Sequence, residues 1–354
     1  AQATHVGSNL GILHGTARVF MVLFARVLLH VLLLLGVAKK TVCRSPVKQG
    51  LKHEGISCPT LLQTTRGTKR GGAVSPEVTI LMGDSRPPFP LGTPRSLHEA
   101  TSIALAAALN LQYAKLHGYR FEFVVYKGNC STRQYGRQVK RHPSWCKLLA
   151  LHDVARRQKD SGTMVFIDSD AVFANMSVTV QSYLQSSELT LPQTNPLFNS
   201  TLPDDLSKED CRIFVPRNDQ NNSLEWPNKT MANAGVHFWT EPFDRAILAD
   251  WWRADVHPQE RQWEQDALNE LVLQQHPRAV CSLDDCPFRL EEGQYIWHFS
   301  EAVFYWKWTG ATGFLRKAFP KLARSSFHEL MLDLKDHIRE MPQDALDAAA
   351  ATLD

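Results

Sequence analysis

Two aspartates at the end of an apolar segment are the residues of this chain best suited to chemistry. Residues 163–167 have the composition of a buried strand, and Asp168 and Asp170 follow, two positions apart. Side chains alternate along an extended strand, so both carboxylates are expected to point the same way. Two ionised carboxylates this close repel each other unless a proton or a divalent cation lies between them. Oxygen ligands suit Mn²⁺ or Mg²⁺, whose remaining positions phosphate oxygens can fill.

Strands and helices alternate around this pair. A capping box of Ser96 and Glu99 is predicted to begin a helix that runs to about 117. The alternation predicts an α/β fold with a mostly parallel sheet flanked by helices, in which ligands bind at the carboxyl ends of the strands. It favours a metal site over the simpler interpretation, a turn cap and a solvated carboxylate. We expect strands at 77–82, 121–126, 163–168, 189–191, 211–215, 279–283 and 294–297, and a turn that leads into a strand within 231–239. Further helices are expected at 143–159, 178–187, 242–254 and 262–275.

The N-terminal region contains one segment that is not typical of a globular protein. Residues 19–38 are twenty mostly apolar residues, enough to span a bilayer as an anchor. The alternative is a signal peptide that is cleaved after Ala38. Residues 1–18 form a short tail before this segment, and residues 39–76 lack periodicity and are predicted to be a stem or linker. The sequence begins at Ala1 rather than at methionine, so we treat the N-terminus as open.

The orientation of this segment is indicated by two conflicting signals. Four basic residues follow it closely, which by the positive-inside rule favours a cytoplasmic C-terminal side. Five Asn-x-Ser/Thr sequons and six of the seven cysteines lie farther along the chain and favour the secretory pathway. We give the sequons more weight and expect a single-pass type II Golgi membrane protein with a luminal catalytic domain. The sequons are at Asn129, Asn175, Asn199, Asn221 and Asn228.

The composition excludes one class of partner and sets the domain boundaries. The net charge is +3, and no block rich in Lys and Arg carries interleaved aromatics, so nucleic-acid binding has no support. With 354 residues the chain can bury one large core or two modest ones. We place the ordered domain at 77–324, and the remaining 325–354 is predicted to be a helical tail with no assigned chemistry.

Five short motifs occur in a fixed order, and together they resemble a known family. They are Trp145-x-Lys147, the aspartate pair, Asn233-Ala234-Gly235, Glu264-Gln265-Asp266-Ala267-Leu268 and an isolated His298. This order is similar to the galactosyl/mannosyl/xylosyltransferase family, which includes plant xyloglucan α-xylosyltransferases and yeast Golgi α-galactosyl- and mannosyltransferases. The resemblance covers about residues 77–300. It implies a GT-A fold, one Rossmann-like domain in which Mn²⁺ (or Mg²⁺) and a UDP- or GDP-sugar bind at the Asp-x-Asp motif.

The resemblance also implies a role for each motif. Asp168 would lie near the ribose and the metal, Asp170 would be a direct metal ligand and His298 the third protein ligand. Lys147 would face the donor, and the backbone of Asn233, Ala234 and Gly235 would lie beside the donor sugar. Gln265 and Asp266 would reach the catalytic centre and hold sugar hydroxyls. The simpler alternatives are a packed aromatic His298, a solvated Lys147, a plain turn at 233–235 and a solvated Asp266.

The expected activity follows from these roles. A hexosyl or pentosyl group would move from the nucleotide sugar to a glycan or glycoprotein acceptor, with retention of configuration. The segment after His298 lacks the glycine of many relatives, and Lys307 would replace a diphosphate-binding lysine, so the donor stays open.

Two other classes of function compete with this one. A haloacid-dehalogenase-type phosphatase would use Asp168 as nucleophile and Asp170 as acid/base, with Asp284 and Asp285 as a later metal pair. That motif normally opens its domain, whereas here two strand–helix units precede it. The other alternative is a fold of the same type that binds glycans without catalysis.

Overall fold

The structure is a computed structural model, and it describes residues 77–134, 137–190, 207–219, 230–254, 264–283, 295–298 and 324–354. The predicted tail, anchor and stem at 1–18, 19–38 and 39–76 lie outside these residues, as do Lys307 and the pair at 284–285. Among the described helices, none is long and apolar enough to cross a membrane.

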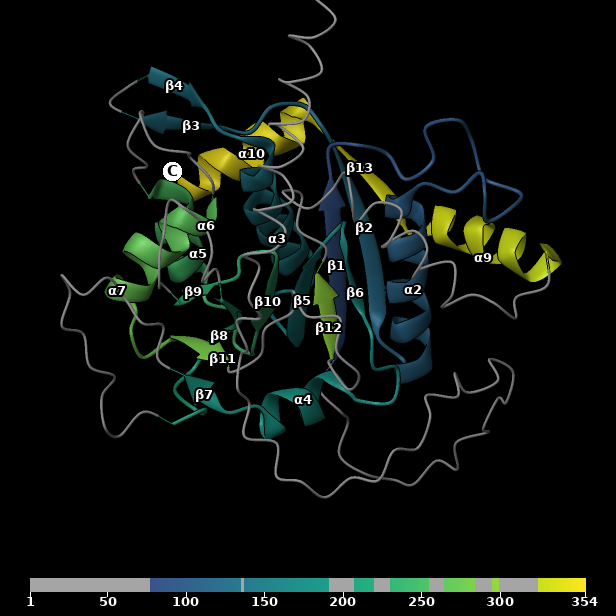
Figure 1. The fold of residues 1–354 in the computed structure, drawn as a ribbon. Coiled ribbons are helices and arrows are strands. Elements are labelled where there is room, and N and C mark those ends of the chain that lie inside the picture. Colours follow the sequence, from purple (N-terminus) through teal and green to yellow (C-terminus); the bar gives the residue numbers. More distant parts are fainter. Residues whose placement is uncertain are drawn as a thin grey trace, which may run out of the picture. The chain divides into compact units, whose positions relative to one another are not determined.

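A nine-stranded sheet forms the centre of the described domain (Figure 1). Its order is β13-β2-β1-β5-β10-β8-β11-β7, with β9 paired to β8. The half from β13 to β5 is parallel, while β10 runs antiparallel to both β5 and β8. Two small sheets, β12-β6 and β3-β4, lie apart from it. The strands are β1 Val78–Asp84, β2 Arg120–Lys127, β3 Ser131–Gln134, β4 Arg137–Lys140, β5 Thr163–Asp168, β6 Ala171–Phe173, β7 Leu189–Thr190, β8 Ile213–Asp219, β9 Thr230–Ala232, β10 Val236–Trp239, β11 Val280–Leu283, β12 Ile296–His298 and β13 Ile338–Pro342.

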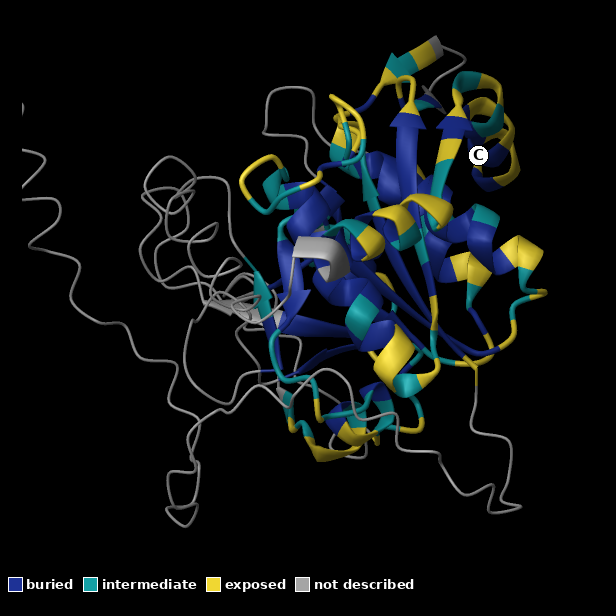
Figure 2. Cartoon of the chain, turned by 90° about the vertical axis from the view of Figure 1, so that its right-hand side faces the viewer, coloured by how far each residue is buried: buried dark blue, intermediate teal, exposed yellow. Residues whose placement is uncertain are grey.

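Helices cover both faces of the sheet. Ile80 and Met82 of β1 belong to a core that includes α2 and α9, whereas Leu81 belongs to a second core that includes α3, α5 and α10. Figure 2 shows the strands between these helices as almost continuously buried. The predicted α/β fold with a mostly parallel, helix-flanked sheet is therefore confirmed. The helical segments are α2 Ser102–His117, η1 Pro143–Trp145, α3 Cys146–Arg157, α4 Val180–Ser186, α5 Arg245–Arg253, α6 Glu264–Ala267, the π-helical η2 Leu268–Val272, α7 Leu273–Gln275, α9 Arg324–Asp336 and α10 Gln343–Leu353.

The helix α2 begins later than the capping box predicts. Ser96 and Glu99 do interact, since the Glu99 carboxylate accepts hydrogen bonds from the Ser96 hydroxyl at 3.1 Å and the Arg95 amide at 2.8 Å. They close a turn, however, and the helix starts at Ser102. Its N-cap is Thr101, whose hydroxyl accepts from the Ala104 amide and donates to the Pro88 carbonyl. The second contact ties the cap to the preceding loop, which the local pattern does not reveal.

The C-terminal region contains a strand where the sequence predicted only helix. Between α9 and α10, β13 extends the main sheet by pairing in parallel with β2. A continuous helix through 338–342 was the wrong prediction, because Pro342 lacks the amide hydrogen and clashes with the preceding turn of a helix. Arg339 of β13 forms ion pairs with Glu122 of β2 and Asp153 of α3, which join the strand to both elements. The boundary between a domain at 77–324 and a tail at 325–354 stays a prediction.

Two disulfides join segments that are distant in sequence. Cys130–Cys146 links the residue before β3 to the start of α3, and Cys211–Cys281 links the segment just before β8 to β11. Several pairings were compatible with the sequence, and the parallel pairing of β8 with β11 brings Cys211 and Cys281 together.

Candidate functional site

The two aspartates and His298 converge at the carboxyl end of β5. β5 ends at Asp168, and β6 begins directly after Asp170. β12 pairs antiparallel with β6 and places His298 opposite Ala171. The His298 Nε2 atom is 3.1 Å from Asp170 Oδ1 and 3.7 Å from Asp168 Oδ2. One ligand atom from each residue lies within 4.8 Å of the others, so the structure brings these three side chains together as the sequence predicts.

The His298 ring is oriented from its other side by Asn233. The Asn233 Nδ2 atom lies 3.1 Å from His298 Nδ1 and donates to it. A neutral ring in this arrangement carries its proton on Nε2, which faces Asp170. Burial by itself would lower the pKa of His298, but the Asp170 and Asp168 carboxylates together outweigh burial and raise the pKa above its usual value.

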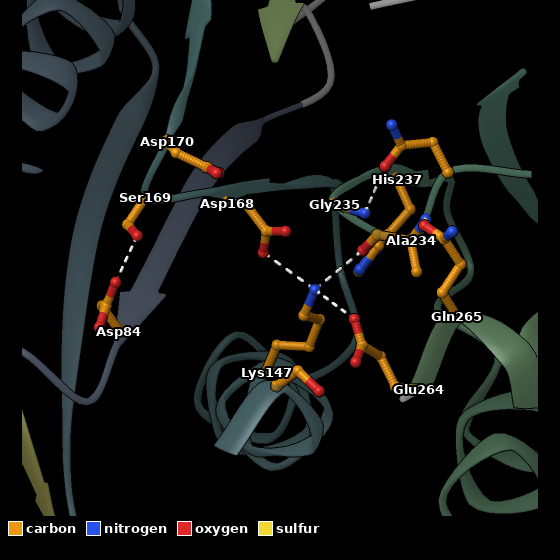
Figure 3. Close-up of polar contacts among 12 residues, drawn as sticks. Asp84, Lys147, Asp168, Ser169, Asp170, Ala234, Gly235, His237, Glu264 and Gln265 are labelled. Atoms are coloured by element: carbon orange, nitrogen blue, oxygen red, sulfur yellow. Dashed lines mark hydrogen bonds and ion pairs between the residues drawn. The ribbon is translucent and has the colours of Figure 1, made fainter. Parts of the chain in front are cut away.

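Lys147 is a buried cation of the site. Figure 3 shows its ammonium group among oxygen atoms of three residues. Its ammonium group lies 2.9 Å from Asp168 Oδ1, 2.7 Å from Glu264 Oε1 and 3.1 Å from the Ala234 carbonyl oxygen. An ammonium group has three hydrogens, and these three acceptors use all of them. The structure therefore ties Lys147 to protein oxygens, and the predicted contact with a donor stays a prediction.

Each oxygen of Asp168 faces a different partner. Oδ1 accepts from Lys147, which leaves Oδ2 on the side of His298. Burial raises the pKa of Asp168 to about 6, although Lys147 and His298 act in the opposite direction. For Glu264, burial also favours the neutral acid, but here the ammonium of Lys147 prevails and lowers the pKa. Asp168 is thus oriented to offer one oxygen, Oδ2, to a cation.

Gly235 is the residue of the 233–235 turn that approaches the site most closely. A β-carbon at this position would lie 2.1 Å from His298 Cε1 and 2.6 Å from Asp168 Oδ2. The Gly235 carbonyl accepts from the Asp168 amide at 2.7 Å, and its amide donates to Asn233 Oδ1 at 2.7 Å. Only glycine leaves room for this approach.

The predicted catalytic pair lies at the start of α6. Gln265 Oε1 accepts from the Ala234 amide at 3.1 Å, so Gln265 supports the same turn that Lys147 contacts from the carbonyl side. Asp266 is half-buried beside it. Whether these two residues hold sugar hydroxyls stays a prediction.

Sequence reasoning assigned no role to Glu264, Asp84 or Ser169. Glu264 lies within a quoted motif, and it would have been a candidate partner for Lys147 had the burial of that lysine been predicted, because buried charges are usually paired. Asp84 ends β1, where Gly83 is in register with Asp168. Its carboxylate accepts from the Ser169 hydroxyl (Figure 3). It also pairs with Arg86 at 2.8 Å. The middle residue of the Asp-x-Asp turn is therefore fastened to the neighbouring strand.

The chemistry of this donor set fits a divalent cation. Two carboxylate oxygens and one imidazole nitrogen are acceptable ligands for Mn²⁺, an ion that also accepts phosphate oxygens as ligands. The arrangement does not identify the metal.

Similar solved structures include known glycosyltransferases. A glycosyltransferase involved in glycosylation of the major capsid of PBCV-1 has 15% identity and a TM-score of 0.40, and the match covers 73% of this chain and 100% of that chain. Mouse xyloside xylosyltransferase 1 in its apo form has 10% identity and a TM-score of 0.34, with 65% and 99% coverage. A comparison with curated protein sequences gave no match.

A family match covers most of the site. Residues 93–282 match the galactosyl transferase GMA12/MNN10 family, which confirms the resemblance drawn from the five motifs. This segment includes Lys147, both aspartates, the 233–235 turn and the pair Gln265 and Asp266, whereas His298 lies beyond it. Because the match spans more than half of the sequence, the protein belongs to the galactosyl transferase GMA12/MNN10 family and is a glycosyltransferase.

Proposed function

We propose that the protein transfers a hexosyl or pentosyl group from a UDP- or GDP-sugar to a glycan or glycoprotein acceptor, depends on Mn²⁺ and retains the anomeric configuration. The observation that carries the proposal is the convergence of Asp168, Asp170 and His298 at the carboxyl end of β5 in a member of a glycosyltransferase family. The family match gives no support to the phosphatase alternative.

The residues around this site have distinct parts in the proposed reaction. Asp168 Oδ2, Asp170 and His298 Nε2 would hold Mn²⁺, which when bound would neutralise negative charge on the leaving diphosphate. His298 can bind through Nε2 only after the proton on that atom is lost and the ring carries its proton on Nδ1. The Asn233 amide, which now donates to Nδ1, would then have to turn its oxygen toward the ring and give up the hydrogen bond that this oxygen accepts from the Gly235 amide.

The backbone of the turn at 233–235 would lie beside the donor sugar. Lys147 holds its carbonyl at Ala234, and Gln265 holds the amide of the same residue. Both backbone groups are therefore fixed before a substrate arrives, which removes part of the cost of ordering the site.

A screen of nucleotide-sugar hydrolysis tests this proposal. UDP- and GDP-sugars are incubated with the purified chain, with and without Mn²⁺, and the released nucleotide is measured; the anomer of a transferred sugar is read by NMR. Asp170→Asn should abolish Mn²⁺-dependent turnover while the fold, checked by circular dichroism, is kept. Asp160→Asn, which breaks the surface pair with Arg245, is the matched control and should keep full activity. Full activity of Asp170→Asn would refute the metal role.

The proposed location is the Golgi lumen, with residues 19–38 as a type II membrane anchor. The five sequons and the two disulfides support it, because disulfides persist in oxidising compartments. Of the two sequons in the described part of the chain, Asn129 is exposed and Asn175 is half-buried. Endoglycosidase treatment of the full chain should lower its mass, and Asn129→Gln should remove part of that shift. An unglycosylated cytosolic chain would contradict the location.

A further inference from the structure

The helix α2 carries one fully buried polar residue in an apolar stretch. Asn110 is 0% exposed and lies among alanines and leucines that pack against the sheet. A buried amide without hydrogen bonds would be costly, so its partners show what it does. Its Nδ2 group donates to the Ala171 carbonyl at 2.9 Å and to the Met82 sulfur at 3.2 Å, and its Oδ1 accepts from the Phe173 amide at 3.0 Å.

These contacts fasten β6 to the helix. The Asn110 amide offers one donor and one acceptor to backbone groups two residues apart, as the edge of a neighbouring strand does. β6 has only three residues, lies outside the main sheet, and has β12 as its one strand partner among the described residues. Figure 1 shows β6 between α2 and β12. Asn110 thus takes the place of a second strand partner for β6.

The position of β6 decides where two of the candidate metal ligands lie. Asp170 directly precedes Ala171, and Ala171 is the register partner of His298. A shift of β6 would therefore move Asp170 and His298, whereas Asp168 belongs to β5 in the main sheet. We propose that Asn110 is a positioning residue of the metal site, which sets the placement of Asp170 and His298 by holding the backbone of β6. This inference rests on the proposed metal-dependent function.

A comparison of variants at two neighbouring α2 positions tests the role. Asn110→Leu keeps a similar volume and removes all three hydrogen bonds, and Asn110→Ala leaves space for water to replace them. Leu111→Ala is the matched control, because Leu111 is equally buried in the same core and has no polar contact with β6. Mn²⁺ affinity is measured by electron paramagnetic resonance of the free ion, and thermal unfolding is recorded without metal. A variant that only loses packing should unfold at a lower temperature and keep its Mn²⁺ affinity, whereas a misplaced ligand should lower the Mn²⁺ affinity.

We expect Asn110→Leu and Asn110→Ala to bind Mn²⁺ about 10- to 100-fold more weakly, the range seen when the partners that orient metal ligands are removed. Leu111→Ala should lower the unfolding temperature comparably and change the affinity less than about threefold. Wild-type affinity in a folded Asn110 variant would overturn the inference, and so would an equal loss in Leu111→Ala. If Asn110→Leu does not fold, Asn110→Ala decides. A wild-type chain that binds no Mn²⁺ would refute the proposed function itself, which is a separate outcome.

Discussion

The two aspartates of the Asp168-Ser169-Asp170 turn are held by different kinds of interaction. Asp168 is in a charged cluster, where the buried Lys147 ammonium joins it to Glu264. Asp170 has His298 as a neighbour, and its position follows from the neutral pairing of β6 with β12. One side of the candidate metal site depends on paired charges, and the other depends on backbone hydrogen bonds.

This difference has an energetic consequence. A buried charge that loses its partner keeps the full cost of its desolvation, whereas a lost neutral hydrogen bond costs much less. Substitutions on the charged side should therefore reduce stability as well as binding. Substitutions on the neutral side should act mainly on metal affinity.

The largest expected effect is on the charged side. Lys147→Met leaves the carboxylates of Asp168 and Glu264 without their cation and should lower the free energy of unfolding by about 3–5 kcal/mol. Lys127→Met is the control, because it breaks a pair with Glu340 in which the side chains are 40% and 65% exposed, and it should cost at most about 1 kcal/mol. Urea denaturation of the metal-free proteins measures both. Equal costs for the two variants would remove the distinction drawn here.

On the neutral side, His298→Ala should act on the metal. We expect the Mn²⁺ concentration for half-maximal turnover to rise about 10- to 100-fold, with little change in stability without metal. His276→Ala is the control, since His276 pairs with Asp250 on a different part of the domain. A His298→Ala variant with an unchanged Mn²⁺ requirement would show that the ligand set is wrong.

The pH dependence of metal binding should reflect both sides. The pKa of Asp168 is raised from 3.8 to about 6, so in the metal-free protein its contribution to stability is complete below pH 3.8 and is lost as pH rises through about 6. A cation competes with that proton, and also with the one that the raised pKa of His298 retains. Mn²⁺ affinity should therefore fall by at least about tenfold per pH unit below 6. Calorimetric titrations between pH 5 and 8 check this, and a flat profile would contradict it.

The amino-acid sequence predicts the pair of aspartates better than it predicts the residues that hold them in place. The site of Asp168 and Asp170 follows from the position of a strand end in an α/β sheet, a rule that acts over a few residues. Strand alternation does not explain their convergence, because β5 ends at Asp168 and residues 169 and 170 form a turn before β6. The partners of Lys147 depend on how α3 and α6 approach each other, which no local pattern encodes. The role of Asn110 cannot be predicted from the sequence for a similar reason. In the sequence it is a single polar residue within an apolar helix, and its function becomes clear only from its hydrogen bonds to the backbone of β6. Likewise, β13 is recognisable as a strand only when β2 is present to pair with it.

The smallest expected effect lies at the middle of the turn, where the charged and neutral sides meet. Ser169→Ala removes the hydrogen bond to Asp84, yet Asp84 keeps its pair with Arg86, so no buried charge is left alone. The free energy of unfolding should fall by about 1–2 kcal/mol. Mn²⁺ affinity should change less than about threefold, because Lys147 still orients Asp168 and the β6–β12 pairing still places Asp170. The same urea and Mn²⁺ titrations measure both quantities. A loss of affinity as large as that of His298→Ala would mean that the link from Ser169 to β1, rather than the two separate sides, sets the distance between the aspartates.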